Sequence, residues 1–402
     1  MEKGKETKPH IGIYGKRNVG KSSLINLITG QNISIVSEQK GTTTDPVKRS
    51  FEILNFAPVI FIDTAGIDDE GNIGKQRSEK TIKTIETVDF AIIVIADNSF
   101  DEYEKEIIKE CKYYSVPFII VHNKSDVEKL DIALKNGLEQ KYNVPVIEFS
   151  TKDNYDKDLI FKEIQKLLPD NSWKQNSLMG DLLQPNDIVL LIMPIDSEAP
   201  TGRMILPQVQ AIRDVLDNNC VCIGLKESEL EHFLKTNHNL KIKFAVTDSQ
   251  LFGKVDKILP KNIPLTGFSI LLARNKGDFE NYLKGTPKIS ELKDGDNILI
   301  LESCSHNISC EDIGRFKIPN LLQKFTQKKL NFEIVAGLDN ISQKITNYSL
   351  VIQCGGCVLT KKQVLNRLKP AVDAEIPVTN YGMAIAYMNG IFEKAIEIFK
   401  IH

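Results

Sequence analysis

Near the start of the chain lies the stretch that decides how its first part folds, Gly15-Lys16-Arg17-Asn18-Val19-Gly20-Lys21-Ser22. It has the form G-x-x-x-x-G-K-S, it follows an apolar run at 11–14, and it opens a helical pattern at 22–28. The glycines let such a loop wrap until its backbone N–H groups point at phosphate oxygens, and the helix N-terminus adds partial positive charge. We expect Lys21 to reach the outer phosphates and the Ser22 hydroxyl to bind Mg²⁺. The pattern predicts a nucleoside triphosphate site with these phosphate-binding residues: Asn18, Val19, Gly20, Lys21, Ser22 and Ser23.

The composition is that of an ordinary globular protein. The 402 residues are 42% hydrophobic and 26% charged, with a net charge of −2. We expect roughly two to four domains and no bulk attraction to nucleic acid or to a membrane surface. No apolar run approaches the ~20 residues needed to cross a bilayer, residues 1–10 do not resemble a signal peptide, and the seven cysteines show no dense disulfide pattern. The composition favours a cytoplasmic protein with neither nucleic acid nor membrane as a partner.

The first predicted domain, residues 8–170, alternates strand and helix patterns. Its strands are expected at 11–14, 51–55, 59–63, 90–96, 117–122 and 146–149. This alternation predicts a mostly parallel sheet covered by helices on both faces, with the ligand at the carboxyl ends of the strands.

Three further motifs stand at those strand ends. Asp63-Thr64-Ala65-Gly66 suits a water-mediated contact of Asp63 to Mg²⁺ and an N–H contact of Gly66 to the γ-phosphate. In Asn123-Lys124-Ser125-Asp126, the Asp126 carboxylate can accept both guanine N1–H and N2–H₂, and the Lys124 stem packs over the loop. Backbone N–H groups of Ser150 and Thr151 can reach the guanine carbonyl. The set predicts binding of GTP and GDP.

Together these motifs resemble a known class of protein. Residues 15–151 are similar to translation-factor-class GTPases, in the group that contains the tRNA-modification GTPase TrmE and the GTPase Era. The resemblance rests on G-x-x-N-V-G-K-S and on the G-T-T-x-D pattern at 41–45, and it implies that Thr43 contacts Mg²⁺ when the γ-phosphate is present.

The resemblance also bears on catalysis. Ile67 follows Gly66, where Ras-like enzymes have a water-orienting Gln. In potassium-activated relatives the residue matching Asn18 holds K⁺ against the phosphates, although Asn18 can also be read as a plain polar loop residue. We therefore predict slow, K⁺-stimulated GTP hydrolysis with four catalytic residues: Asn18, Lys21, Thr43 and Gly66.

The middle of the chain, residues 176–266, predicts a small α/β domain. Strand patterns at 187–193, 220–225 and 243–246 alternate with helical patterns at 206–217 and 228–235. It shows no recognisable catalytic set. Short exposed strands can pair with a twin across a sheet edge, so we expect this domain to form a homodimer.

The last predicted domain, residues 267–402, opens with a helical pattern at 268–282 and then has strand patterns at 297–302, 332–336, 349–352 and 376–379. The first of these strands is followed by Cys304-Ser305-His306 and the third by Cys354-Gly355-Gly356-Cys357. If the strands are parallel, the three cysteines emerge at one edge of a Rossmann-like sheet. The sequence thus predicts three α/β domains, the last carrying a metal site.

Four interpretations of these cysteines remain open from the residues alone. Cys304, His306, Cys354 and Cys357 form a Cys₃His zinc set, which leads on spacing. An iron–sulfur cluster on the three thiolates comes next, then a redox C-x-x-C pair, then cysteines that only line a core.

The arrangement of the whole chain adds a second resemblance. A GTPase, a small α/β domain, C-x-H, a gap of 46 residues (307–352) and then Q-C-G-G-C resemble HydF, the family of maturation GTPases of [FeFe]-hydrogenase, which carries C-x-H followed by H-C-x-x-C. This implies a [4Fe–4S] cluster on Cys304, Cys354 and Cys357 that scaffolds a transient diiron subcluster. It also implies a homodimer, the radical-SAM maturases HydE and HydG as partners, and delivery to the apo-hydrogenase.

One position departs from the family pattern. Gln353 stands where the family often has His, which leaves the fourth ligand open. The candidates are His306, Glu302, Asp312, Asp339 and water. The alternative function is a zinc-stabilised GTPase of the TrmE/Era kind acting in RNA modification or ribosome assembly, and a third is a GTP-regulated thiol oxidoreductase.

Overall fold

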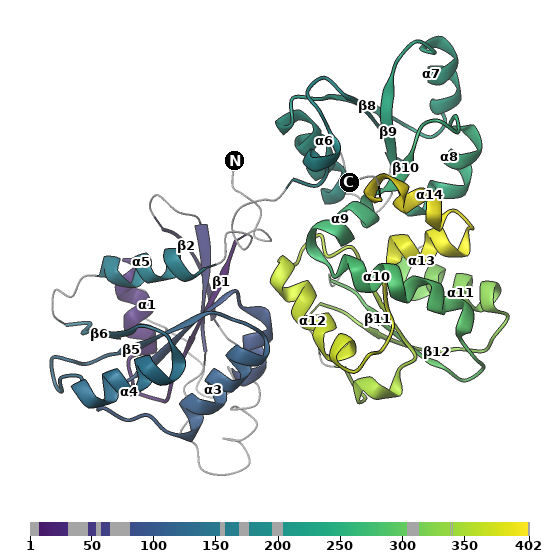
Figure 1. Ribbon diagram of the computed structural model, residues 1–402. Coiled ribbons are helices and arrows are strands. Elements are labelled where there is room, and N and C mark those ends of the chain that lie inside the picture. The colour runs from purple at the N-terminus through teal and green to yellow at the C-terminus, as the bar shows by residue number, and fades with distance from the viewer. Residues whose placement is uncertain are drawn as a thin grey trace, which may run out of the picture. The chain divides into compact units, whose positions relative to one another are not determined.

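The protein folds into two compact units, Met1–Gln175 and Asn176–His402 (Figure 1). The structure is a computed structural model, and it describes residues 8–30, 47–53, 58–64, 81–152, 157–168, 177–194, 204–303, 313–337, 339 and 341–400. Within these residues no helix is both long enough and apolar enough to cross a membrane.

The first unit is built on a six-stranded sheet with the order β2-β3-β1-β4-β5-β6. Its strands are β1 (His10–Tyr14), β2 (Val47–Glu52), β3 (Pro58–Asp63), β4 (Phe90–Ile95), β5 (Phe118–His122) and β6 (Val146–Glu148). Its α-helices are α1 (Lys21–Thr29), α3 (Glu102–Tyr113), α4 (Ile132–Tyr142) and α5 (Lys157–Leu167). All neighbouring strands are parallel except β2, which runs antiparallel to β3. The predicted mostly parallel sheet is confirmed, although its edge strand begins at Val47 rather than at 51.

Two apolar cores cover the two faces of this sheet. Leu24 and Ile28 of α1 pack with Ile164 of α5 in one core. Ile107 of α3 and Leu138 of α4 lie in the other. Strands covered on both faces become continuous apolar runs, and β4 (FAIIVI) is buried along its whole length. The loops at the carboxyl ends of β1, β5 and β6 are thereby held by a rigid scaffold.

The second unit contains two four-stranded parallel sheets, with the orders β10-β9-β7-β8 and β12-β11-β13-β14. The strands of the first are β7 (Ile188–Ile192), β8 (Val221–Leu225), β9 (Ile242–Thr247) and β10 (Leu265–Gly267). Those of the second are β11 (Asn297–Leu301), β12 (Asn331–Val335), β13 (Leu350–Gln353) and β14 (Val378–Asn380). The α-helices are α6 (Leu206–Asp217), α7 (Leu230–Thr236), α8 (Phe252–Ile258), α9 (Phe268–Lys276), α10 (Phe279–Gly285), α11 (Ile318–Thr326), α12 (Lys361–Asp373), α13 (Tyr381–Met388) and α14 (Phe392–Ile396).

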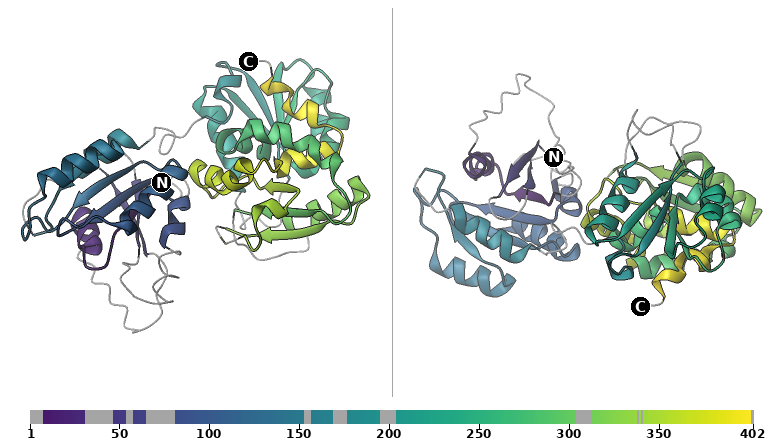
Figure 2. Two further views of the ribbon diagram at one scale, coloured as in Figure 1. Left: turned by 60° about the horizontal axis from the view of Figure 1, so that its bottom comes forward. Right: turned by 90° about the horizontal axis from the view of Figure 1, so that it is seen from above.

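One apolar core joins these two sheets. It contains Leu190 and Ala245 of the first sheet together with Ile300 and Val351 of the second. Helix α14 lies beside β10 (Figure 1 and Figure 2). The Thr266 hydroxyl donates to the carbonyl oxygen of residue 395 at 2.8 Å. The predicted boundary between the second and third domains, at 266/267, therefore falls inside a strand that the carboxy-terminal helices support.

The helix predicted at 268–282 is wrong as a single element. The chain forms α9, which ends at Lys276, and α10, which begins at Phe279. Gly277 follows α9 directly, and the Asp278 side chain caps α10 by accepting from the N–H of Asn281 at 3.2 Å. A glycine followed by an N-cap residue outweighs a continuous helical pattern in this segment.

Candidate nucleotide site and cysteine site

At two positions the loop between β1 and α1 adopts a backbone conformation that favours glycine. Gly15 and Gly20 have φ values of +148° and +92°. A Cβ at Gly15 would lie 2.3 Å from the carbonyl oxygen of Val94, and one at Gly20 would lie 2.2 Å from Nδ2 of Asn123. Asn18, exposed between them, is also left-handed, with φ of 62°. The predicted phosphate loop therefore has the tight wrap that its glycines are expected to provide.

Lys21 and Ser22 begin α1 and point back into this loop region. Lys21 is only 6% exposed, and its ammonium donates to the carbonyl oxygens of Gly15 at 2.9 Å and Lys16 at 2.7 Å. The Ser22 hydroxyl donates to Asp63 Oδ2 at 2.8 Å, at the end of β3. Burial raises the pKa of Asp63, and this is opposed by its contacts with Ser22, Lys21 and Arg49. An ammonium, a hydroxyl and a carboxylate thus gather at one point, which is the donor set that phosphate with Mg²⁺ requires.

The residues predicted to read guanine lie at the ends of β5 and β6. Asn123 is 1% exposed, and its Nδ2 donates to the carbonyl oxygen of Val19 at 2.8 Å, which ties this motif to the phosphate loop. The Ser150 hydroxyl donates to Asp126 Oδ1 at 2.7 Å. This hydrogen bond is the main cause of the lowered pKa of Asp126, and Lys152 adds to the effect. Asp126 is therefore an ionised acceptor, as recognition of guanine requires.

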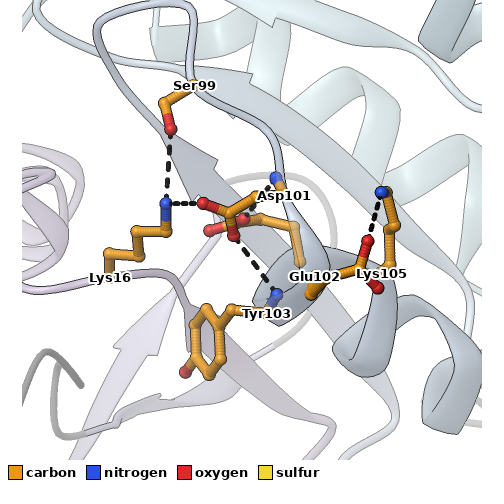
Figure 3. A network of polar contacts seen from close by, with 7 residues as sticks. Lys16, Ser99, Asp101, Glu102, Tyr103 and Lys105 are labelled. Carbon is orange, nitrogen blue, oxygen red and sulfur yellow. Dashed lines mark hydrogen bonds and ion pairs between the residues drawn. The ribbon is translucent and has the colours of Figure 1, made fainter. Parts of the chain in front are cut away.

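A contact of the phosphate loop that sequence reasoning missed involves Lys16 (Figure 3). Its ammonium pairs with the Asp101 carboxylate and donates to the Ser99 hydroxyl at 3.2 Å. Asp101 caps α3 by accepting from the N–H of Tyr103, and the Glu104 carboxylate accepts from the N–H of Asp101 at 3.0 Å. The loop is thereby anchored to the start of a helix more than 80 residues away. Sequence spacing gave no signal for it, because Lys16 occupies a variable position of the motif.

Some of the predicted nucleotide residues cannot be placed. Thr43, Gly66 and the 41–45 pattern lie outside the described residues. Of the remaining ones, Lys124 is left-handed with φ of 62°, Ser23 is exposed and Thr151 is half-buried. The structure thus brings together the phosphate and guanine motifs but leaves the switch residues as predictions.

The second candidate site lies at the carboxyl ends of β11 and β13. These strands are parallel, Leu301 is opposite Gln353, and the N–H of Cys354 donates to the carbonyl oxygen of Leu301 at 2.9 Å. The backbone N–H of Ser303 donates to Cys354 Sγ at 3.1 Å, and the Ser303 Oγ lies 2.7 Å from the same sulfur. Gln353 is fully buried, and its Nε2 lies 3.6 Å from Cys354 Sγ. Its Oε1 has no hydrogen-bond partner among the residues that the structure describes.

The other described cysteine of this edge is Cys357, which is half-buried. Burial, and next the nearby Cys354, raise the pKa of Cys357; the Lys276 ammonium and the backbone N–H groups of Val358 and Cys357 oppose them. Gly356 has φ of +67°, and a Cβ there would lie 2.8 Å from Cγ2 of Val364. The turn between the two cysteines therefore depends on this glycine.

The remaining predicted ligands are only partly placed. Cys304, His306 and Asp312 lie outside the described residues, and the structure shows no group of three possible metal ligands among those it does describe. Glu302 is 3% exposed and pairs with Arg315 at 3.1 Å, so its carboxylate already has a cationic partner. Asp339 follows β12, and its N–H donates to the carbonyl oxygen of residue 336 at 3.1 Å.

Comparison with known protein families agrees with this arrangement. Residues 178–277 match the hydrogen maturase F dimerization domain, and residues 280–398 match the hydrogen maturase F tetramerization domain. The chain belongs to the hydrogen maturase F (HydF) family. Residues 10–124 match the 50S ribosome-binding GTPase family, so the first unit of this HydF-family chain is a GTPase domain that binds guanine nucleotide and Mg²⁺.

Curated relatives support the GTPase part. GTPase Der of Wolinella succinogenes is 32% identical over 166 residues, which are 39% of this chain and 35% of the relative. GTPase Era of Caldicellulosiruptor saccharolyticus is 31% identical over 167 residues, 40% of this chain and 55% of the relative. The tRNA modification GTPase MnmE of Aliarcobacter butzleri is 35% identical over 167 residues, 40% of this chain and 35% of the relative. The chain therefore spans about a third to about half of the length of these relatives.

Proposed function

We propose that this chain is a GTP-hydrolysing scaffold. In this proposal a [4Fe–4S] cluster on Cys304, Cys354 and Cys357 holds the diiron subcluster precursor, which the chain delivers to apo [FeFe]-hydrogenase. The observation that carries the proposal is the pair of contacts from Ser303 to Cys354 Sγ, one from its N–H and one from its hydroxyl. Cys304 follows Ser303 directly in the sequence, so it is covalently joined to a residue that contacts Cys354. Membership of the HydF family supports the link to hydrogenase maturation.

The described residues fit an iron–sulfur cluster. Thiolates that bind such clusters are stabilised by N–H and O–H groups directed at sulfur, and Cys354 has one donor of each kind from Ser303. A redox pair instead needs a thiol with a lowered pKa, whereas burial raises the pKa of Cys357. A cluster with three cysteine ligands supplies one iron whose fourth ligand can be exchanged, which is the position where a diiron unit can attach. The pairing of Glu302 with Arg315 favours His306 or water as that ligand over Glu302.

In this proposal the GTPase unit regulates the contacts that the scaffold makes with its partners. Lys21 and Ser22 would hold the phosphates and Mg²⁺, while Thr43 and Gly66 would contact the ion and the γ-phosphate. We assign K⁺ binding to Asn18, whose exposed position in the phosphate loop leaves its side chain available to a cation beside the phosphates. GTP binding in this unit would then tune contacts with the maturases HydE and HydG and not drive the cluster chemistry.

The edge of the first sheet of the second unit supports the proposed homodimer. β8 is an edge strand, and its Val221 is 48% exposed. Edge strands present unpaired N–H and C=O groups that pair readily with another strand. Two copies of the chain would therefore associate through β8, in keeping with the match to a dimerization domain.

Anaerobic reconstitution with iron and sulfide tests the cluster. We expect a brown protein with about four irons per chain. Replacing Cys304, Cys354 or Cys357 by Ser should abolish the colour, while Cys222→Ser, which changes a half-buried cysteine of β8, should not. A colourless protein that binds one zinc tightly would refute the scaffold and favour the zinc-stabilised GTPase. Iron that is unaffected by all three substitutions would refute the ligand assignment.

A further inference from the structure

Asn98 lies in the turn between β4 and α3, and its side chain reaches the chain segment that follows the guanine motif. Its Nδ2 donates to Glu128 Oε1 at 2.8 Å and to the carbonyl oxygen of Lys129 at 2.9 Å. Its Oδ1 accepts from the N–H of Asp131 at 2.9 Å. A single amide therefore makes three hydrogen bonds to the segment that follows Asp126.

The backbone of this turn suits an asparagine. The N–H of Ser99 donates to the carbonyl oxygen of Ala96 at 3.0 Å, and the two residues between them, Asp97 and Asn98, have φ values of 55° and 48°. Two left-handed central residues are typical of a type I′ turn, and Asn and Asp tolerate this conformation better than other residues with a side chain. Glycine adopts the same backbone readily, so Asn98→Gly would remove the amide and keep the turn.

A second contact joins this turn to the guanine motif itself. The N–H of Asn98 donates to Nε2 of His122, at the end of β5, at 3.4 Å. Because Nε2 accepts, a neutral ring carries its proton on Nδ1, which lies 3.3 Å from Oγ of Ser125 and can donate to it. Both His122 and Ser125 are buried. The buried ring thus connects the turn to a residue of the motif at 123–126.

The same part of the chain also holds the phosphate loop. The Lys16 ammonium donates to the Ser99 hydroxyl at 3.2 Å and pairs with the Asp101 carboxylate (Figure 3). The four-residue segment 98–101 therefore contacts both the loop expected to bind phosphate and the loop expected to bind guanine. A segment this short leaves little freedom between its contacts, so it fixes the spacing of the two loops before a nucleotide binds. Fixing binding groups in advance lowers the cost of ordering them on binding.

We propose that Asn98 is a positioning residue for guanine recognition, which holds Asp126 in its place relative to the phosphate loop. Asn98 acts through the segment 128–131 and not by contact with the nucleotide. The inference rests on the GTPase part of the proposed function, with guanine recognition assigned to Asp126, and it does not depend on the iron–sulfur cluster. Loss of the Asn98 amide weakens recognition of the base more than binding of the phosphates.

The first test measures binding of GDP and of inosine diphosphate (IDP) to the full-length chain with Mg²⁺ by calorimetry. IDP has the N1–H of GDP but lacks its N2 amino group, so it gives Asp126 one hydrogen bond instead of two. In Asn98→Gly we expect the preference for GDP over IDP to fall about fivefold or more, because GDP depends more strongly on the position of this carboxylate. Asp97→Gly is the matched control, because it removes an exposed side chain from the same turn, and it should keep the preference of the parent.

Two results of this titration would overturn the proposal. Affinities for GDP and IDP that fall by the same factor in Asn98→Gly would show that the residue supports the fold and does not position Asp126. An unchanged preference with unchanged affinities would show that Asp126 keeps its place without the amide.

Hydrogen exchange of the same variant locates the effect in the chain. The amide of Asp131 should exchange about tenfold faster in Asn98→Gly, because its acceptor is removed. The amide of Lys135 donates to the carbonyl oxygen of Asp131 at 2.9 Å, so it should change much less and serves as an internal control. Unchanged exchange at Asp131 would refute the role given to this contact.

Asp126→Asn separates the inference from the assignment on which it rests. An unchanged preference for GDP over IDP in this variant would refute guanine recognition by Asp126, and the inference with it. A preference that falls in Asp126→Asn but is kept in Asn98→Gly would refute only the inference.

Discussion

Replacing Glu104 by Gln is expected to remove a pH-dependent loss of stability from the GTPase unit. Glu104 is 1% exposed in the first turn of α3, and its carboxyl accepts the N–H of Asp101 at 3.0 Å. Burial raises the pKa of Glu104 from 4.5 to about 7. A glutamine has nearly the same shape, can accept the same hydrogen bond and never becomes charged. The substitution thus isolates the cost of ionising this carboxyl.

The sign and the size of this stability change follow from the difference between the pKa of Glu104 in the folded chain and its pKa in the unfolded chain. Because the folded pKa of Glu104 lies above the unfolded value, the folded chain binds more protons between pH 4.5 and about 7, so stability falls as the pH rises through this window. One pKa unit is about 1.4 kcal/mol, so the loss is about 3 kcal/mol by the time the pH exceeds 7. Asp101 has the opposite effect on stability, because Lys16 lowers its pKa below the ordinary 3.8. Its effect falls in a lower pH window than that of Glu104.

Hydrogen exchange of the full-length chain measures this effect directly. Exchange of the α3 amides, residues 102–113, reports their opening free energy at mildly acidic and mildly alkaline pH. The parent should lose protection in α3 as the pH rises, after correction for intrinsic exchange, and Glu104→Gln should not. Glu102→Gln is the control, because the Glu102 side chain is 90% exposed in the same turn. Equal pH dependence in the parent and in Glu104→Gln would refute the assignment.

Three further outcomes are expected. Asp126→Asn should weaken GTP binding by about 10- to 100-fold in a nucleotide titration, because a charged acceptor of two guanine N–H groups becomes a neutral one; unchanged affinity would exclude its role in reading the base. Gly20→Ala should abolish nucleotide binding in the same assay, because the new Cβ would lie 2.2 Å from Asn123 Nδ2 on a backbone with φ of +92°, and full binding would show that the loop can rearrange. Val221→Lys should shift the chain toward monomer in sedimentation velocity, whereas Ile132→Lys, at a position 74% exposed in the GTPase unit, should not; a dimer that survives the first change would place the interface elsewhere.

The sequence predicted the parts of the fold that rest on local patterns. The phosphate loop, five of the six strands of the GTPase sheet and the parallel strands beneath the cysteines follow from glycine placement and apolar runs, and the structure confirms them. Convergence of Lys21, Ser22 and Asp63 could also be expected, because parallel strands deliver their carboxyl ends to one edge.

Contacts that depend on tertiary packing could not be predicted in this way. Lys16 pairs with Asp101, and Lys276 donates to the loop that carries Cys357. In each case the two partners are more than 75 residues apart in the sequence, and no spacing rule describes such a contact. The break between α9 and α10 was missed because apolar periodicity continues through Gly277 and Asp278. The shared core of the two sheets was missed because a sequence pattern shows that a face is buried but not what covers it.

The bond between Thr266 and the carbonyl of residue 395 has a consequence for synthesis on the ribosome. The partner that covers β10 is encoded 129 residues later, so a nascent chain carries the first sheet of this unit with one side bare until α14 has emerged. We expect this first sheet to reach its native stability only after the cysteine-bearing sheet has been translated. The part of this unit that is made first would then wait for the part that is made last before its fold is complete.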